Sequence, residues 1–399
     1  MQYANLFPVV TDVGALASSK PKSELDMELS RALEENKVGE IQYPDWRGVL
    51  NAFKDRELFR VDMRHILGLT REFDDFSVEL TELAEVTLST ALRHCEAELR
   101  AKHGEPLLDN GEPCGLSLLA LGKCGGRELG FASDIELMFV YTGDGRTNGL
   151  NSVTTAEYFE QLVRSIVSAW QTRQEGIFQI DLRLRPYGKA GSMAVSFESF
   201  KTYYAPDGAA WAYERQALVK LRPITGDEKL NEEICKLRDI YAYESGPFDV
   251  TSMRAMRERQ VRHLVTGGTF NAKFSRGGLV DIEYLIQGLQ INHGAQNASL
   301  RLTNLREAMS ALHSAGILTD TDYTRLHKAY TFLRWLIDSL RVVRGNSKDV
   351  TMPPFGTDEF NFLARRLRYE ADVEQLRDEL ARYIADVQEI NTRLLSRGA

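Results

Sequence analysis

Three acidic side chains in the middle of the chain have the types and the spacing that bind a divalent cation. Asp134 and Glu136 stand two residues apart in the otherwise apolar run "SDIELMFVY", and residues two apart in a strand point to the same face. Neighbouring carboxylates repel each other and destabilise a strand. A positive charge is therefore expected between them. Asp181, on another predicted strand, supplies a third carboxylate.

This set of carboxylates suits the transfer of a nucleotidyl group. Mg²⁺ and Mn²⁺ prefer hard oxygen ligands, and neighbouring strands hold such ligands rigidly. Two metal ions about 4 Å apart can orient a nucleoside triphosphate, activate an attacking hydroxyl and stabilise the pyrophosphate that leaves. We therefore interpret Asp134, Glu136 and Asp181 as catalytic, metal-binding residues.

A glycine-rich turn and several cations accompany the carboxylates. The turn Gly122–Gly126 offers backbone N–H groups that no side chain covers, and a helix that begins there would favour phosphate at its N-terminus. Cationic side chains that can contact phosphate oxygens follow in the turn and downstream: Lys123, Arg183, Arg185, Lys220 and Arg222.

Each of these features also has a purely structural interpretation. An isolated Asp-x-Glu in a strand usually lies on a solvated face, and a glycine-rich turn is more often a plain loop or a helix cap. Arg183 and Arg185 could simply pair with Asp181 or with surface acids. The co-occurrence of the turn with three acids favours the chemical interpretation. The sequence contains no serine nucleophile elbow, zincin helix, Walker loop or dinucleotide fingerprint.

Hydrophobic periodicity predicts the elements that must position these residues. In chain order they are a helix near Ser23–Glu35, helical structure over about 46–102, a buried strand at 115–121, the acidic strand at 134–141, a helix over "TAEYFEQLVRSIVSAWQTR", a strand over "GIFQIDLRLRPYG" and a candidate strand over "ALVKLRPI". Beyond about residue 252 the pattern is helical, with "RGNSKDVTMPPFG" as an extended loop.

We therefore predict an α+β fold in three parts. Residues 1–102 form an N-terminal helical segment, residues 103–250 a mixed catalytic domain, and residues 251–399 an all-α helical bundle.

Composition limits the class of protein. The 399 residues carry a formal net charge of −8, which argues against non-specific binding of nucleic acid. The four cysteines show neither zinc-ligand spacing nor a disulfide pattern. The first residues lack the pattern of a signal peptide, and no apolar run approaches the roughly 18 residues of a membrane span. We expect a cytoplasmic protein.

Five motifs in order carry a resemblance to a known family. "LGKCGGRELGFASDIELMFVY" resembles the nucleotidyltransferase motif of the glutamine-synthetase adenylyltransferase/adenylyl-removing enzymes. "DLRLRPYGKAGSMAVS", "AWAYERQALVKLRPITGD", "KFSRGGLVDIEYLIQ" and "LRVVRGNSKDV…LARRLRY" resemble later parts of the same family. The similarity covers about residues 53–395.

The resemblance implies a polymerase-β-like nucleotidyltransferase domain followed by a helical bundle. It implies that Asp134, Glu136 and Asp181 bind Mg²⁺ or Mn²⁺, that Gly125 and Gly126 approach the nucleotide, and that the other nucleotide-binding residues are Gly122, Lys123, Ser133, Arg183, Arg185 and Lys220. Glu136 departs from the aspartate that is most common there. The implied reaction is attack by a tyrosine hydroxyl of glutamine synthetase on the α-phosphate of ATP, which releases pyrophosphate and regulates nitrogen assimilation.

Family members usually contain two such units, of which one attaches AMP and the other removes it by phosphorolysis. "AAWAYERQALVK" and "GGLVDIEYLIQ" are more similar to the C-terminal, attaching unit. Two alternatives stay open: the removing activity, and a non-catalytic module that binds glutamine synthetase or the PII signal protein.

The motif "RGGLVDIEYLIQ" also has two interpretations. Acids near the N-terminus of a helix are stabilised by its dipole without any further role, which would account for Asp281 and Glu283. Alternatively, Lys273, Arg276 and these acids line a cleft that faces the nucleotide or the target tyrosine.

Overall fold

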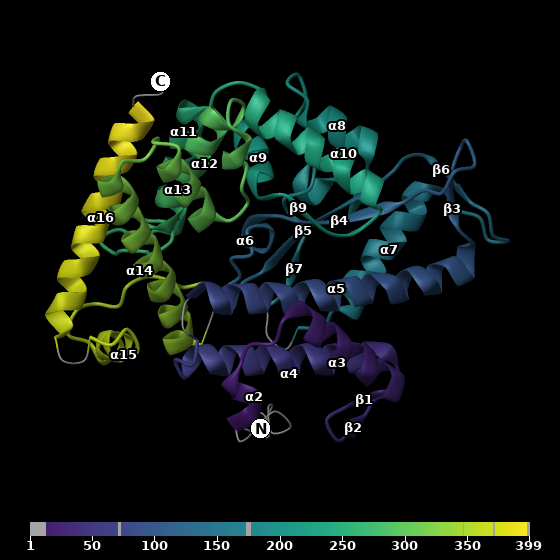
Figure 1. Ribbon diagram of the computed structural model, residues 1–399, viewed down its shortest axis with the longest axis horizontal. Helices are drawn as coiled ribbons and strands as arrows, with labels where there is room; N and C mark the ends of the chain where they lie inside the picture. The colour runs from purple at the N-terminus through teal and green to yellow at the C-terminus, as the bar shows by residue number, and fades with distance from the viewer. Residues whose placement is uncertain (1–12, 71–72, 173–176, 346, 370–371, 397–399) are drawn as a thin grey trace. The chain divides into compact units, whose positions relative to one another are not determined.

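The computed structural model describes residues 13–70, 73–172, 177–345, 347–369 and 372–396 (Figure 1). The chain forms two compact units. Unit 1 consists of Met1–Ala209 and Leu221–Lys236, and unit 2 of Ala210–Lys220 and Leu237–Ala399. The three predicted carboxylates all belong to unit 1. The three-part division expected from the sequence is a different partition and stays a prediction.

Unit 1 begins with helices that pack against one another. Its elements here are α2 (Val13–Ala17), α3 (Lys22–Glu35), the hairpin of β1 (Lys37–Val38) and β2 (Ile41–Gln42), α4 (Trp46–Ile66) and α5 (Phe73–His103). The helices α4 and α5 lie side by side (Figure 1). Asp45 caps α4 by accepting a hydrogen bond from the N–H of Gly48. The helical structure predicted for this region is confirmed.

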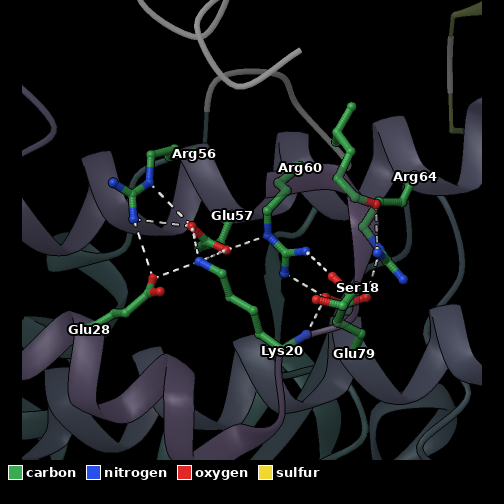
Figure 2. Close-up of polar contacts among 9 residues, drawn as sticks. Ser18, Lys20, Glu28, Arg56, Glu57, Arg60, Arg64 and Glu79 are labelled. Carbon is green, nitrogen blue, oxygen red and sulfur yellow. Dashed lines mark hydrogen bonds and ion pairs between the residues drawn. The ribbon is translucent and has the colours of Figure 1, made fainter. Parts of the chain in front are cut away.

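Paired charges are buried where α4 meets α5. The Arg60 guanidinium lies between two carboxylates, with Nε 2.6 Å from Glu57 Oε2 and Nη2 2.5 Å from Glu79 Oε1 (Figure 2). All three side chains are about 2% exposed or less. The backbone N–H of Lys20 also donates to Glu79. Because a buried charge is tolerated only when it is paired, this cluster fixes the link between α2 and α3 on the α4–α5 pair.

A five-stranded mixed sheet follows. Its strands are β4 (Leu116–Ala120), β5 (Ile135–Tyr141), β7 (Ile180–Asp181), β8 (Ala194–Ser196) and β9 (Arg222–Gly226). Strand β4 pairs antiparallel with β5 and β9, and β5 pairs in parallel with β7 at its start and with β8 at its end. The remaining elements of unit 1 are β3 (Pro106–Leu108), α6 (Gly122–Gly125), β6 (Gly145–Thr147), α7 (Thr155–Ala169), η2 (Gly188–Ala190), α8 (Phe197–Tyr204) and most of α10 (Glu228–Asp239).

The acidic strand is buried on both faces beyond its first two residues. The face opposite Glu136 is buried, with Ile135, Leu137, Phe139 and Tyr141, but Met138 and Val140 on the same face as Glu136 are buried as well. Only Glu136 within β5 is half-exposed. The carboxylates therefore stand at the one end of β5 where the sheet is not covered.

Two predicted strands differ from the structure. The strand expected to continue through Leu184 ends at Asp181, because the chain turns there and Arg185 donates hydrogen bonds back to the carbonyl of Leu182. The strand expected over "ALVKLRPI" is a 3₁₀ helix, η3 (Leu218–Lys220), followed by β9. Val219 and Lys220 are both buried, so no alternating exposed face exists there.

Unit 2 is helical. It contains α9 (Ala212–Ala217), η3, η4 (Ile240–Glu244), α11 (Val250–Leu264), α12 (Leu279–Gly294), η5 (Ala298–Leu300), α13 (Leu305–Ser314), α14 (Asp320–Arg344), α15 (Asp358–Arg366) and α16 (Val373–Ser396). Helix α16 packs along α12 and α14. The predicted α+β fold class, with a helical region in the C-terminal part of the chain, is confirmed, and the polymerase-β-like topology of the first domain stays a prediction. Within the described ranges, no helix is both long enough and apolar enough to cross a membrane.

Candidate active site

The parallel pairing of β5 with β7 brings two of the acids together. Glu136 and Asp181 are register partners, and partners in neighbouring strands project from the same face. Asp134 lies two residues before Glu136, just ahead of the strand, and like the other two it is half-buried. The sheet thus gathers the three carboxylates at the start of β5.

The glycine turn lies directly against this end of β5. It forms α6, a single turn after β4, and the N–H of Leu121 donates to the carbonyl of Glu136 at 2.9 Å. Gly122 has a φ of +50°, and a Cβ there would lie 2.8 Å from the carboxyl carbon of Glu136. Only glycine meets both conditions. The position therefore allows the turn to approach the carboxylate.

Other positions predicted to bind the nucleotide help to build the turn. The N–H groups of Gly125 and Gly126 donate to the carbonyls of Leu121 and Gly122, so these N–H groups are used within the turn. The buried Ser133 hydroxyl accepts a hydrogen bond from the N–H of Gly130 at 3.0 Å. Lys123 is half-buried in α6, and its carbonyl accepts from the N–H of Glu128.

Arg222 donates hydrogen bonds to two carbonyl groups of the glycine turn. Its Nε donates to the carbonyl of Gly125 at 3.1 Å, and its Nη2 donates to the carbonyl of Cys124 at 3.2 Å. The same Nη2 lies 2.6 Å from Oε1 of Glu85 on α5. The sequence grouped Arg222 with cations for phosphate, whereas the structure uses it to position the glycine turn.

Helix α5 supplies the acids that anchor this region. Glu85 is buried and also accepts from Nζ of Lys22 at 2.6 Å. Burial disfavours its charge, but Arg222 and Lys22 outweigh that effect, so the pKa of Glu85 is lowered. One turn earlier, Glu82 pairs with Arg127, the residue after the turn, at 2.7 Å. Sequence analysis missed both acids, although Glu85 stands in the apolar run "ELAEV", where a charge needs a partner.

Arg183 is a cation that lies beside one of the three carboxylates, that of Asp181. Its guanidinium makes a two-pronged contact with Asp181, with Nε to Oδ1 at 2.9 Å and Nη2 to Oδ2 at 2.5 Å. Partial burial would raise the pKa of Asp181, but the hydrogen bonds from Arg183 lower it. Asp181 raises the pKa of Arg183 most, and Asp134 and Glu136 add to that rise.

The other two predicted cations have different surroundings. Arg185 donates to the carbonyls of Leu182, Gly191 and Ser192 and so closes the loop after β7, and burial lowers its pKa. Lys220 belongs to unit 2, where it is buried in η3. Its assignment to the nucleotide stays a prediction.

The donor set fits a hard divalent cation. All three groups are carboxylates, two of them are register partners, and the third projects from the same end of β5. In the part of the chain that the structure describes, no three carboxylate, imidazole or thiol side chains converge closely enough to hold a metal ion as they stand. The Asp181 carboxylate pairs with the Arg183 guanidinium. To bind a metal ion, Asp181 would have to give up this ion pair.

Two family models match the chain. A model of the glutamate-ammonia ligase adenylyltransferase family matches residues 1–236, and a model of the GlnD PII-uridylyltransferase matches residues 251–395. The bifunctional glutamine synthetase adenylyltransferase/adenylyl-removing enzyme of Hahella chejuensis is 32% identical over 328 residues, which are 80% of this chain and 34% of that enzyme.

Two further relatives have the same name. The protein of Xanthomonas campestris pv. campestris (strain B100) is 31% identical over 88% of this chain and 38% of its own length. That of Stenotrophomonas maltophilia is 33% identical over 76% of this chain and 33% of its own length. The chain thus spans about a third of the length of these relatives. Because the first family model covers more than half of the chain, the chain belongs to the glutamate-ammonia ligase adenylyltransferase family.

Proposed function

We propose that unit 1 is a metal-dependent nucleotidyltransferase that moves AMP from ATP to a tyrosine of glutamine synthetase. The observation that carries this proposal is the pairing of Glu136 with Asp181 beside a glycine turn, in a chain of this family. The names of the relatives support glutamine synthetase as the target. A cytoplasmic location is part of the same proposal.

Asp134, Glu136 and Asp181 are the residues that would hold Mg²⁺ or Mn²⁺. A divalent cation bound there would neutralise the charge of the triphosphate and of the pyrophosphate that leaves. Glu136 cannot move away from the site, because its backbone pairs with β7 and its carbonyl accepts from Leu121. It therefore provides the fixed ligand of the three.

Arg183 is the residue that we expect to change partners. Its side chain is 63% exposed, whereas the Asp181 side chain is 13% exposed. The guanidinium can therefore rotate into solvent without disturbing the sheet. If Asp181 held a cation, the guanidinium of Arg183 would be available for a phosphate oxygen of ATP, to which its planar fork is suited.

The glycine turn has a steric role. Because Gly122 has no side chain, none lies against the Glu136 carboxylate at this point of the turn. Arg222 donates to the carbonyl of Gly125 and so holds the turn in place. Triphosphate can then approach the carboxylates closely. The tyrosine oxygen forms a bond to the α-phosphorus and loses its proton to solvent, the bond from that phosphorus to the oxygen that bridges to the β-phosphate breaks, and pyrophosphate leaves.

The direct test is incubation with glutamine synthetase, Mg²⁺ and α-labelled ATP. We expect label on a synthetase tyrosine with release of pyrophosphate, and loss of at least 100-fold in rate in Asp134→Asn. Asp144→Asn is the matched control, because Asp144 is exposed beyond the opposite end of β5. A fully active Asp134→Asn would contradict the assignment.

A second arm decides the direction of the reaction. The motifs "AAWAYERQALVK" and "GGLVDIEYLIQ" favour attachment of AMP, but both units of the family share the carboxylates. Adenylylated glutamine synthetase with inorganic phosphate should give no ADP if this is the attaching unit. Appearance of ADP there, with no label transfer in the first arm, would assign the removing activity instead.

Regulation through PII is a further part of the proposal for unit 2. The GlnD PII-uridylyltransferase model matches residues 251–395, which form most of unit 2. We expect PII to change the rate of label transfer in the assay above. An unchanged rate at saturating PII would contradict regulation through PII. It would not contradict the nucleotidyl transfer proposed for unit 1.

A further inference from the structure

Unit 2 contains a half-open pocket of about 300 Å³ that the proposed chemistry does not use. Helix α11 forms one wall, the loop before α12 a second, and α16 a third. Three arginines line it: Arg254 and Arg257 from α11, and Arg276 from the loop. Its volume lies at the lower end of the range for small-molecule sites, about 300–1,000 Å³.

The "RGG" motif builds the wall between α12 and α16. Gly277 has a φ of +78°, and a Cβ there would lie 2.7 Å from the carbonyl oxygen of Ile384 on α16. Its N–H donates to Oδ2 of Asp281 at 2.6 Å. Gln388 on α16 donates to the carbonyl of Arg276 at 3.0 Å. The backbone on which Arg276 stands is therefore fixed against α16.

Arg257 forms the rigid back of the pocket. It is 7% exposed, and its Nε lies 2.7 Å from Oδ1 of Asp281. Its Nη1 donates to Gln260, and its Nη2 donates to the carbonyls of Phe274 and Ser275. These contacts account for Asp281 structurally, because both of its carboxylate oxygens are engaged. They do not account for Arg276.

The charge that remains at the pocket is positive. Its lining has three guanidinium groups and two carboxylates, those of Glu258 and Asp281. Arg257 and Asp281 pair with each other, so the rest of the lining contributes two guanidinium groups, those of Arg254 and Arg276, and one carboxylate, that of Glu258. Arg276 is exposed, and no hydrogen bond or ion pair of the described residues occupies its guanidinium.

We propose that this pocket binds a small anion that carries carboxylate or phosphate groups. Arginine contacts such groups through two parallel N–H donors, and Arg276 is placed to do so from a fixed backbone. Asn391 and Thr392 on α16 add polar groups to the wall, and Met253 and Val261 on α11 add apolar surface. The pocket is large enough for a compact metabolite with several charged groups.

The test is calorimetric titration of the full chain, without metal or nucleotide, at a fixed ionic strength of about 0.15 M. The probes are citrate, succinate and inorganic phosphate, so that carboxylate and phosphate chemistry are distinguished. We expect saturable binding of at least one probe, at least ten-fold weaker in Arg276→Gln. Arg276→Lys should weaken it less, because the charge is kept and the fork is lost.

Two controls make the result decisive. Arg259→Gln removes an exposed arginine of α11 that does not line the pocket, and it should bind the probe as the unaltered chain does. Asp134→Asn should bind it equally well, which separates this pocket from the carboxylates of unit 1. Circular dichroism confirms that each variant is folded. No saturable binding, equal weakening in Arg259→Gln, or loss of binding in Asp134→Asn would each overturn the proposal.

Discussion

At the scale of single residues, Arg183 and Gly122 determine the surroundings of two of the carboxylates. Arg183 places a positive charge against Asp181, and Asp134 and Glu136 add to the rise in the pKa of Arg183. Gly122 keeps the space next to Glu136 free of a side chain. We expect another cation to be able to replace Arg183 as the partner of Asp181, whereas a side chain at position 122 would clash with Glu136. Substitutions at the two positions should therefore act differently.

Removing the Arg183 guanidinium should strengthen metal binding in the absence of nucleotide. Arg183→Gln leaves Asp181 without its competing cation, and an exposed pair of this kind contributes up to about 1 kcal/mol. We expect Mn²⁺ affinity to rise about two- to five-fold, as measured by electron paramagnetic resonance, while KM for ATP increases. Weaker Mn²⁺ binding would show that Arg183 does not compete for Asp181.

Substitution of Gly122 should damage both the fold and the site. Gly122→Ala places a methyl group against the Glu136 carboxylate in a left-handed backbone conformation, which alone costs about 1–2 kcal/mol. Gly111→Ala is the matched control, because Gly111 has a φ of +84° and nothing within 4 Å of its Cβ position. Denaturant unfolding should show a larger loss for Gly122→Ala, and only that variant should lose activity. Equal losses would contradict the close approach.

Helix α5 is the element on which the site is built. Three acids at three-residue spacing, Glu79, Glu82 and Glu85, bind the α4 cluster, Arg127 and Arg222 respectively. The N-terminal helices are thereby tied to the glycine turn through paired, mostly buried charges. A substitution in α5 that breaks one of these ion pairs should therefore alter the position of the glycine turn without altering the carboxylates themselves.

Arg222 should affect the nucleotide more than the chemical step. We expect Arg222→Gln to raise KM for ATP about ten-fold, with a smaller change in kcat and partial recovery in Arg222→Lys. Arg127→Gln is the control, since it breaks an ion pair to the same helix but leaves the carbonyls of Gly125 and Cys124 in place. Equal effects of the two glutamine variants would contradict a positioning role for Arg222.

The Glu85 anchor should make stability depend on pH in acid. The pKa of Glu85 is lower in the folded chain than its usual value, so its stabilising contribution is complete above the unfolded pKa of about 4.3. That contribution is lost as the pH falls through the folded pKa. The difference in unfolding free energy between the unaltered chain and Glu85→Gln should therefore shrink below about pH 4. A difference that stays constant down to pH 3 would contradict this.

Local sequence patterns predicted some of these elements and not others. Helix α7 follows from three- and four-residue periodicity, and strand β5 follows from a short apolar run. The prediction that the strand continues through Leu184 was wrong. The chain turns after Asp181 because Arg185 contacts carbonyls up to seven residues later. The partnership of Glu85 with Arg222, 137 residues apart, leaves no local signal. The register of Glu136 with Asp181 is likewise a contact between distant segments.

At the scale of the whole molecule, the two units match two different family models. Unit 1 contains the carboxylates and the glycine turn, and unit 2 contains the arginine-lined pocket. We propose accordingly that chemistry belongs to the first unit and that the second responds to PII and to a small anion. The chain spans about a third of its relatives' length, so these roles are proposed for this chain alone.

The most direct test of the carboxylate site is a titration with Mn²⁺ followed by electron paramagnetic resonance, in the presence of an ATP analogue that cannot be cleaved between the α- and β-phosphates. We predict that the unaltered chain and Asp144→Asn bind Mn²⁺ and the analogue together, and that Asp134→Asn binds the pair at least ten-fold more weakly. Equal binding by Asp134→Asn, with its fold intact, would contradict the assignment of the nucleotidyl-transfer site to the start of β5.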